Sequence, residues 1–483
     1  MTKVIMIQGS GSNVGKSLIV AGLCRFFTNK GLKVRPFKPQ NMSNNAAVTS
    51  DGGEIGRAQA LQAMACNCEP HTDMNPILLK PESEYGSQVI VQGKRFATLQ
   101  AKDYFVQKPL LLGKALESFS RLKKNADLII IEGAGSPAET NLRKGDIANM
   151  GFAEAIGAPV IIIGDIDRGG VIAQLVGTHV VISPEDRKRI VGFIINKFRG
   201  DPNLFLNGIE DIKLKTKWSS LGILPWFQSA WKLPAEDIMD IKEKKGGHIK
   251  VVVPKLNRIS NFDDLDPLLL ERNISVEIIS PGKPLPGDAK LIILPGSKST
   301  ISDLQLIRSQ GWDIDIFAHI RRGGHILGIC GGYQMLGNTI RDPHKIEGNV
   351  TEIAGLGLLN VSTTMHPEKK LQNVTGKHIS SGAEISGYEM HIGKTFGPDC
   401  ENPLLMIDGK GSGAVGKNNK ILGCYLHGMF ASDTFRSEFL QNLNSTSVLS
   451  DYQGSVNNTL DELAEYLHQH MDTKQFLNLT QTL

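Results

Sequence analysis

Short runs of aliphatic residues recur along the chain, and each run is followed by a glycine-containing turn and a stretch of helix length. Continuous apolar runs are typical of parallel strands that are buried on both faces and joined by crossover helices. The pattern therefore predicts an α/β fold with open, mostly parallel sheets. In the first half of the chain the predicted strands are Val4–Ile7, Asp127–Ile131, Val160–Ile163 and Ile190–Ile195.

A second series of apolar runs predicts a second α/β domain in series with the first. At 483 residues the chain is too long for one hydrophobic core. The charged, glycine-bearing segment 241–248 is the best candidate for the boundary. We therefore predict domains at residues 1–240 and 249–440, followed by a C-terminal helical extension at 441–483. The second series of strands is Ile249–Val253, Val276–Ile279, Leu291–Leu294 and Ile326–Ile329.

Composition narrows the class of protein without identifying it. The chain has 41% hydrophobic and 21% charged residues, a formal net charge of +4 and no long block of lysine or arginine. That balance argues against a nucleic-acid partner and is compatible with an anionic small substrate. Six scattered cysteines form no disulfide framework, and we interpret Cys66 and Cys68 as core thiols.

The amino terminus enters the first predicted strand without the layout of a signal peptide. No apolar run approaches the ~20 residues that a membrane-spanning helix needs. We therefore expect a cytosolic protein with no membrane partner. The sequence does not indicate an oligomeric state.

A glycine-rich turn lies between the first predicted strand and a helix that is predicted to begin at Lys16. Backbone N–H groups in such a turn cradle phosphates, the lysine reaches the terminal phosphates, and Ser17 can hold Mg²⁺. The strict phosphate-loop pattern places glycine at position 10, where this chain has Ser10, and the longer loop resembles that of the dethiobiotin-synthetase-like branch. The alternative is a plain turn between strand and helix. The predicted ATP-binding residues of the loop are Gly9, Gly15, Lys16 and Ser17.

Three side chains that follow predicted strands extend this site. Lys38, in the predicted strand 32–39, could add a second cation over the phosphates. Glu132 follows the strand 127–131 and is a candidate to bind Mg²⁺ beside the loop. Asn196 resembles the asparagine that reads a purine base in related folds. Each alone is more often a surface charge or a strand-end cap, but ligands bind at the carboxyl ends of parallel strands.

The segment 323–337 has the layout of a nucleophile elbow with a cysteine as the nucleophile. A buried strand ends at Cys330, two glycines permit a tight turn, and a helix is predicted from Tyr333 onward. A thiolate at a helix amino terminus is stabilised by the helix dipole, and the N–H of Gly331 can donate to an oxyanion. The alternative is a buried core cysteine, which needs no glycines on both sides.

His427 is the best candidate for the base that pairs with Cys330. Gly296 lies in a turn after another predicted strand and is a candidate for the second oxyanion donor. This combination resembles a class I glutamine amidotransferase domain, which forms a glutamyl thioester and releases ammonia. Most members of that class carry an acid two residues after the histidine, where this chain has Met429. The third member is therefore absent or elsewhere, with Glu389 as one candidate.

Taken together, the order of these motifs resembles the cobyric acid synthase family of glutamine-hydrolysing amidating enzymes in adenosylcobalamin biosynthesis. The resemblance runs from the phosphate loop to beyond His427. It implies a P-loop domain of the dethiobiotin-synthetase type followed by a flavodoxin-like amidotransferase domain. Its most specific parts are the blocks Pro39-Gln40-Asn41-Met42 and Asp51-Gly52-Gly53-Glu54-Ile55-Gly56-Arg57-Ala58-Gln59.

The resemblance also implies a reaction. That reaction is stepwise amidation of the b, d, e and g carboxylates of a corrinoid, adenosylcobyrinic acid a,c-diamide, with ATP, Mg²⁺ and glutamine as ammonia donor. Candidates for corrinoid or acyl-phosphate contacts are Asn41, Asn44, Asp51 and Arg57, which otherwise form a polar loop over the nucleotide. The alternatives are cobyrinic acid a,c-diamide synthase, which amidates an earlier corrinoid, and a P-loop ATPase with a degenerate amidotransferase domain.

Overall fold

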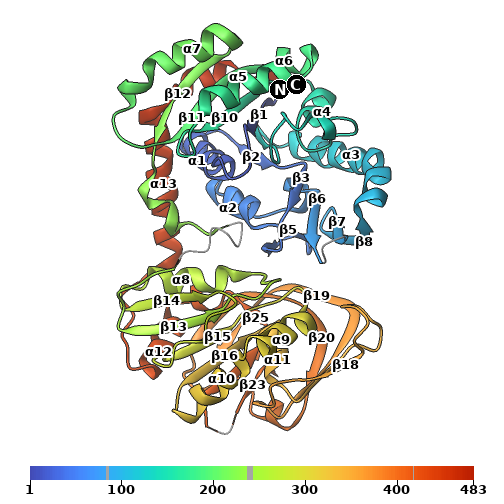
Figure 1. Cartoon of the computed structure of the whole chain (residues 1–483), viewed down its shortest axis with the longest axis vertical. Coiled ribbons are helices and arrows are strands. Elements are labelled where there is room, and N and C mark those ends of the chain that lie inside the picture. Colours follow the sequence, from blue (N-terminus) through green and yellow to red (C-terminus); the bar gives the residue numbers. More distant parts are fainter. Residues whose placement is uncertain (83–85, 236–242, 417) are drawn as a thin grey trace. The chain divides into compact units, whose positions relative to one another are not determined.

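The apolar runs form parallel strands in both halves of the chain, as a computed structural model shows (Figure 1). The structure describes residues 1–82, 86–235, 243–416 and 418–483. Two units are present. The first consists of Met1–Ser43, Thr49–Pro234 and Val456–Leu483, and the second of Asn44–Val48 and Ala235–Ser455.

The predicted domain limits differ in detail from these units. The first unit's main segment ends at Pro234, whereas the predicted limit at residue 240 lies outside the described residues. The predicted extension 441–483 is divided, because its residues up to Ser455 belong to the second unit and the rest to the first.

A parallel sheet forms the centre of the first unit, and its strands are rich in the β-branched residues that favour this structure. Its order is β12-β11-β10-β1-β9-β2, and the short β26 pairs antiparallel with β1. The strands are β1 (Lys3–Gly9), β2 (Val34–Phe37), β9 (Leu128–Glu132), β10 (Val160–Asp165), β11 (Ile190–Phe198), β12 (Ser219–Pro225) and β26 (Gln481–Thr482).

A smaller sheet in the same unit has the order β3-β6-β7-β8. Its strands are β3 (Gln40–Met42), β6 (Ile77–Pro81), β7 (Gly86–Val91) and β8 (Lys94–Gln100). The first unit also contains the separate short strand β5 (Glu54–Gly56). The helices of the first unit are α1 (Lys16–Asn29), α2 (Arg57–Ala65), α3 (Ala101–Lys123), α4 (Met150–Ile156), α5 (Val171–Val181), α6 (Pro184–Arg189), α7 (Leu206–Thr216) and α14 (Thr473–Asn478).

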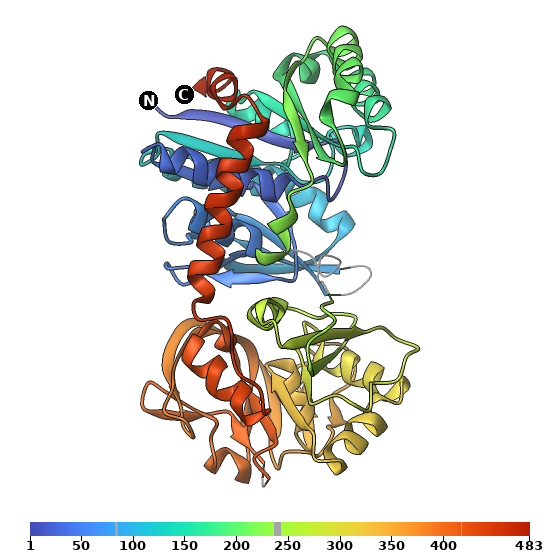
Figure 2. The same cartoon turned by 90° about the vertical axis from the view of Figure 1, so that its left-hand side faces the viewer.

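The first helix has the predicted start and lies against α13 (Tyr452–His470), a long helix near the C-terminal end of the chain. Helix α1 begins at Lys16 after Gly15, which has a φ of 98°, and Gly31 follows its end with a φ of 89°. Such backbone angles favour glycine over residues with a side chain. Helix α13 packs Leu463 and Leu467 against Gly22 of α1, and the two helices lie side by side in both views (Figures 1 and 2).

The second unit is built around another, mostly parallel sheet of order β14-β13-β15-β16-β24-β23, in which only β23 is antiparallel to its neighbour. Its strands are β13 (Ile249–Pro254), β14 (Ile274–Ile279), β15 (Leu291–Leu294), β16 (His325–Ile329), β23 (Ala414–Val415) and β24 (Ile421–Cys424). The helices are α8 (Asp266–Leu270), α9 (Thr300–Ser309), α10 (Trp312–Arg321), α11 (Gly331–Leu336) and α12 (Asp433–Asn442).

A second sheet in this unit contributes residues around Cys330. Its path is β18-β17-β19-β20-β25, with β21 and β22 attached to β19. The strands are β17 (Thr339–Arg341), β18 (Glu352–Ala354), β19 (Ser362–His378), β20 (Glu384–Phe396), β21 (Leu405–Ile407), β22 (Lys410–Ser412) and β25 (Leu426–His427). The second unit also contains the separate short strand β4 (Ala46–Val48). Within the described residues, we find no helix of the length and apolarity that crossing a membrane requires.

Candidate active sites

The phosphate loop connects β1 to α1, and its glycines leave room for polar groups. Lys16 donates from Nζ to the carbonyl oxygens of Gly11 (3.1 Å) and Gly135 (3.2 Å), which hold the ammonium over the loop. A Cβ atom on Gly9 would lie 2.9 Å from Lys16 Nζ, and one on Gly15 would lie 2.3 Å from the amide nitrogen of Asn196. Side chains at either glycine would therefore displace groups of the site.

Glu132 is the centre of a buried polar cluster at the end of β9. Its side chain is fully buried, and its Oε1 accepts hydrogen bonds from Ser17 Oγ (2.7 Å) and Lys38 Nζ (2.8 Å). Its Oε2 accepts from Gln62 Nε2 (2.6 Å). Burial by itself would raise the pKa of Glu132, but the Lys38 charge and these hydrogen bonds lower it below the usual value. The carboxyl group is therefore ionised. Its hydrogen bonds bring Ser17, Lys38 and Glu132, all three predicted from the sequence, together in one cluster.

Gln62 is a member of this cluster that the sequence analysis did not select. It lies in α2, is fully buried, and its Oε1 has no hydrogen-bond partner among the described residues. The sequence holds only one hint, which is that Gln59 and Gln62 lie three residues apart in a helix otherwise rich in alanine.

The side chains of Ser17 and Glu132 are suited to binding Mg²⁺. An ionised carboxylate and a hydroxyl are hard oxygen ligands, which Mg²⁺ prefers. The Lys38 ammonium, 2.8 Å from Glu132, shows that the carboxylate already attracts a cation. Ser17 and Glu132 are thus the residues that could hold the ion, as predicted from the sequence.

Asn196 lies against the back of the phosphate loop. Its Nδ2 donates to the carbonyl oxygen of Val14 (2.8 Å), while the neighbouring Lys197 donates to the carbonyl oxygen of Asn13 (2.6 Å) and to Asp165 (2.8 Å). Asn196 is therefore near the predicted nucleotide site, and its side-chain amide is hydrogen-bonded to the backbone of the phosphate loop.

Of the four candidate corrinoid contacts, Asn41, Asp51 and Arg57 belong to the first unit and Asn44 to the second. Asn41 is buried in the first unit and donates to Gln59 Oε1 (2.9 Å), whereas Asn44 belongs to the second unit. Arg57 is the first residue of α2 and is half-buried. These positions leave the corrinoid contacts a prediction.

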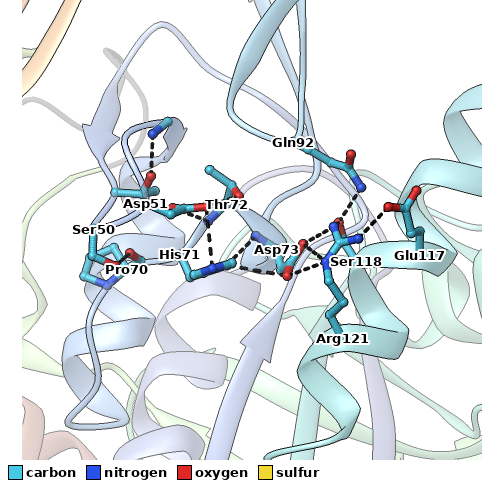
Figure 3. Close-up of polar contacts among 12 residues, drawn as sticks. Ser50, Asp51, Pro70, His71, Thr72, Asp73, Gln92, Glu117, Ser118 and Arg121 are labelled. Carbon is cyan, nitrogen blue, oxygen red and sulfur yellow. Dashed lines mark hydrogen bonds and ion pairs between the residues drawn. The ribbon is translucent and has the colours of Figure 1, made fainter.

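Asp51 is part of a different cluster (Figure 3). Its carboxylate accepts from Thr72 Oγ1 (2.5 Å) and lies 3.5 Å from His71 Nε2. Next to it, Asp73 accepts three hydrogen bonds from Nε and Nη2 of Arg121, which also contacts Glu117. These side chains other than Glu117 line a cavity of about 580 Å³, whose lining contains no residue of the phosphate loop. Asp51 is thus separate from the cluster around Glu132.

Cys330 has the backbone of a nucleophile elbow. It follows β16 and precedes α11, with a φ of 52° and a ψ of −108° that are unusual for a residue with a side chain. Its N–H donates to the carbonyl oxygen of Cys424 (2.8 Å), and its thiol donates to that of Met390 (3.5 Å). Gly332 is required at the turn, because a Cβ atom there would lie 1.9 Å from the carbonyl oxygen of Leu294.

His427 pairs with an aspartate that the sequence analysis did not identify. His427 is 1% exposed, and its Nδ1 lies 2.8 Å from Oδ2 of Asp264, in the short 3-10 helix Phe262–Leu265. Burial lowers the pKa of His427, but the Asp264 charge and hydrogen bond, with a hydrogen bond to Cys330, raise it to about 10. The histidine is therefore held as an imidazolium beside the thiol.

Glu389 does not serve as the partner of His427. Its buried carboxylate is ion-paired with Lys370 and accepts from Gln372 (3.3 Å). The reason is the register of β20 and β25, which places Glu389 opposite Leu426 and Tyr388 opposite His427. Side chains of neighbouring residues in a strand point to opposite faces, so Glu389 cannot share the face of Tyr388.

The two predicted oxyanion glycines lie close to the Cys330–His427 pair. A Cβ atom on Gly296 would be 2.9 Å from His427 Cε1, and one on Gly331 would be 2.9 Å from the backbone nitrogen of Ser297. The turn after β15 and the elbow after β16 therefore meet beside the thiol. Backbone N–H groups from two such turns are the donors that an oxyanion hole needs.

Comparisons with known proteins match both halves of the chain to known families. Residues 5–241 match the model of the CobQ/CobB/MinD/ParA nucleotide binding domain, and residues 250–435 match that of the CobB/CobQ-like glutamine amidotransferase domain. The chain is 59% identical to a cobyric acid synthase of Ruegeria sp. over 99% of both chains. It is 56% identical to that of Bradyrhizobium diazoefficiens over 99% of this chain and 100% of the relative. The chain belongs to the cobyric acid synthase family, which confirms the resemblance drawn from its motifs.

Proposed function

We propose that the protein amidates the b, d, e and g carboxylates of adenosylcobyrinic acid a,c-diamide with ammonia from glutamine. The observation that carries this proposal is that the chain, a member of this family, brings together the residues predicted for two separate sites. One is the cluster of Lys16, Lys38 and Glu132 at the phosphate loop, and the other is the pair of Cys330 and His427 at the elbow. ATP and glutamine are both present in the cytosol, which is the proposed compartment.

At the elbow, the Cys330 thiolate attacks the side-chain carbonyl carbon of glutamine. The negative charge that develops on the carbonyl oxygen is stabilised by backbone N–H groups of the turns at Gly296 and Gly331. His427 gives its proton to the departing nitrogen, and ammonia leaves as the thioester forms. His427 then takes a proton from water, which attacks the thioester and releases glutamate and the thiol.

At the phosphate loop, a corrinoid carboxylate attacks the terminal phosphorus of ATP, giving an acyl phosphate and ADP. Ammonia then attacks the acyl carbon and phosphate leaves, which is possible because phosphate is a far better leaving group than oxide. Lys16 and Lys38 stabilise the charge on the transferred phosphoryl group. Mg²⁺, held by Ser17 and Glu132, supplies further neutralisation of the phosphate oxygens when bound.

Mass spectrometry of the corrinoid tests the substrate assignment. Adenosylcobyrinic acid a,c-diamide is incubated with the enzyme, ATP, Mg²⁺ and amide-¹⁵N glutamine, and we expect stepwise gain of labelled amides up to the fully amidated product. A parallel reaction with cobyrinic acid tests the alternative of a,c-diamide synthesis. Glutamine hydrolysis without any change in the a,c-diamide would reject the proposed substrate while leaving the amidotransferase assignment in place.

Replacing Gln62 with methionine tests its place in the metal site. The change removes the 2.6 Å hydrogen bond to Glu132 Oε2 at similar side-chain volume. Residues that orient a metal ligand typically contribute about 10- to 100-fold to metal affinity, so we expect a loss of that size in Mg²⁺ affinity. Calorimetric titration of Mg²⁺ into the ADP-bound enzyme measures it directly.

Gln92→Met is the matched control for this variant. Gln92 donates to Ser118 in the cluster of Figure 3, so its loss removes an amide of the same unit outside the nucleotide site. Unchanged Mg²⁺ affinity in Gln62→Met, or an equal loss in both variants, would contradict a role for Gln62 in orienting Glu132.

A further inference from the structure

We propose that Asp264 is the positioning residue of the amidotransferase site and replaces the acid that the chain lacks at position 429. The inference rests on the proposed glutamine hydrolysis by Cys330 and His427. It adds the residue that fixes the orientation and tautomer of His427. Position 429 is occupied by a methionine that is fully buried.

The Asp264 carboxylate is held by two donors that are adjacent in the chain. Its Oδ2 lies 2.8 Å from His427 Nδ1, and its Oδ1 accepts from the backbone N–H of Gly428 (2.6 Å). Asp264 is only 3% exposed, so water does not compete effectively for either oxygen. A carboxylate held at both oxygens in this way cannot rotate without losing a hydrogen bond, and it therefore fixes the imidazole edge that it faces.

A second set of contacts fixes the plane of the imidazole. The ring of Tyr388 stacks on that of His427 with 5.2 Å between centroids and 16° between planes. The Tyr388 hydroxyl donates to Asp263 (3.0 Å) and accepts from Asn261 Nδ2 (2.8 Å). Two aspartates of one short helix thus hold the two stacked rings. Asp263 accepts a hydrogen bond from the Tyr388 hydroxyl, and Asp264 pairs directly with His427.

This geometry determines which nitrogen faces the thiol. A carboxylate only accepts, so Nδ1 must carry the hydrogen that bonds to Asp264. The other edge of the ring points toward the turn at Gly296, where a Cβ atom would lie 3.5 Å from Nε2. Nε2 is therefore the atom that exchanges a proton with Cys330 and with the departing ammonia.

The charged and titratable groups around His427 leave Asp264 as its acidic partner. They come from three elements: Asp264 from the helix Phe262–Leu265, Cys330 from the elbow, and Tyr388 and His391 from β20. Burial, and secondarily the Lys370 charge, lower the pKa of His391 to about 3, so that imidazole is neutral. Asp264 thus balances the imidazolium charge of His427.

Asp264→Asn is the test, because it keeps the shape and removes the charge. The asparagine oxygen must still accept from Gly428, which turns the amide nitrogen toward His427 Nδ1 and forces hydrogen onto Nε2. That tautomer cannot take a proton from Cys330. We expect kcat for glutamine hydrolysis to fall by about 100- to 10,000-fold with little change in KM, while amidation from ammonium salts persists.

The pH dependence of Cys330 alkylation gives a readout that a purely structural role would not change. In the wild type the Asp264 charge and hydrogen bond raise the pKa of His427 to about 10, so a positive charge lies beside Cys330 at neutral pH and favours its reaction with iodoacetamide. Without the Asp264 charge, burial lowers the pKa of His427 and the ion pair is lost. Alkylation of the Cys330 peptide, measured by mass spectrometry, should then be slow at neutral pH and rise only as the solution becomes alkaline.

Two variants complete the design. Asp288→Asn makes the same chemical change at a carboxylate on the surface of the same unit, which is 70% exposed and pairs with Lys250, so we expect wild-type alkylation and wild-type kcat. Asp264→Glu keeps the charge and should retain the wild-type alkylation profile at reduced kcat. A wild-type profile in Asp264→Asn, or the profile of Asp264→Asn in Asp264→Glu, would overturn the positioning role. An inactive wild type would instead reject the proposed hydrolysis of glutamine.

Discussion

Replacing Cys330 with alanine is expected to abolish amidation from glutamine, by more than about 1,000-fold, while amidation from ammonium salts continues near the wild-type rate. Alanine cannot form the thioester, so no ammonia is released from glutamine. The backbone is not expected to change, because alanine and cysteine carry the same Cβ atom at the unusual φ of 52°. Corrinoid products formed with each nitrogen source are counted by mass spectrometry.

Cys400→Ala is the matched control for this prediction. Cys400 is a half-buried thiol of the same unit, lies near the Tyr333 hydroxyl (3.8 Å) and does not face His427. It should retain both activities. Loss of amidation from both nitrogen sources in Cys330→Ala, with unchanged thermal unfolding, would contradict two separable sites. Retention of glutamine-dependent amidation would remove Cys330 from the mechanism.

Replacing Lys16 with methionine is expected to give the opposite separation of activities. Lys16 donates to the backbone carbonyl oxygens of Gly11 and Gly135 over the phosphate loop, where its ammonium can reach phosphate oxygens. Removing one such charge typically costs about 100- to 1,000-fold in rate. We expect that loss for amidation from both glutamine and ammonium salts, with glutamine hydrolysis retained.

Lys30→Met provides the comparison for Lys16→Met. Lys30 lies just beyond the other end of α1, where its ammonium is 5.5 Å from the centre of the Phe26 ring. It should amidate normally. The two activities are measured separately, as glutamate release and as corrinoid mass. If Lys16→Met amidates from ammonium salts at the wild-type rate, the phosphate loop does not bind the reacting nucleotide.

Residues within one local motif could be placed from the sequence because their geometry is local. Gly15, Lys16 and Ser17 are consecutive, and the turn between a strand and a helix determines where they point. The same holds for Cys330 with its flanking glycines, since the tight turn needs residues without side chains. Even the lack of an acid at position 429 was visible in the sequence.

The position of Glu132 beside Ser17 and Lys38 could be predicted from the order of the strands. A parallel sheet places the ends of its strands along one edge, so Ser17, Lys38 and Glu132 were expected at one site. The structure brings all three within hydrogen-bond distance, because β9 lies between β1 and β2 in the sheet. The block around Asp51 did not follow this rule. Asp51 accepts a hydrogen bond from Thr72, whereas Gln62, eleven residues later, donates to Glu132.

By itself, the sequence determined the two α/β domains, the phosphate loop, the elbow and the family, because those depend on periodicity and on contiguous motifs. Only the tertiary structure selected Gln62 and Asp264. Gln62 is 70 residues from Glu132, and Asp264 is 163 residues from His427. An aspartate in a short helix, like a glutamine in an alanine-rich one, has no local pattern of its own. Its role depends on which distant side chain the packing of the sheets places against it.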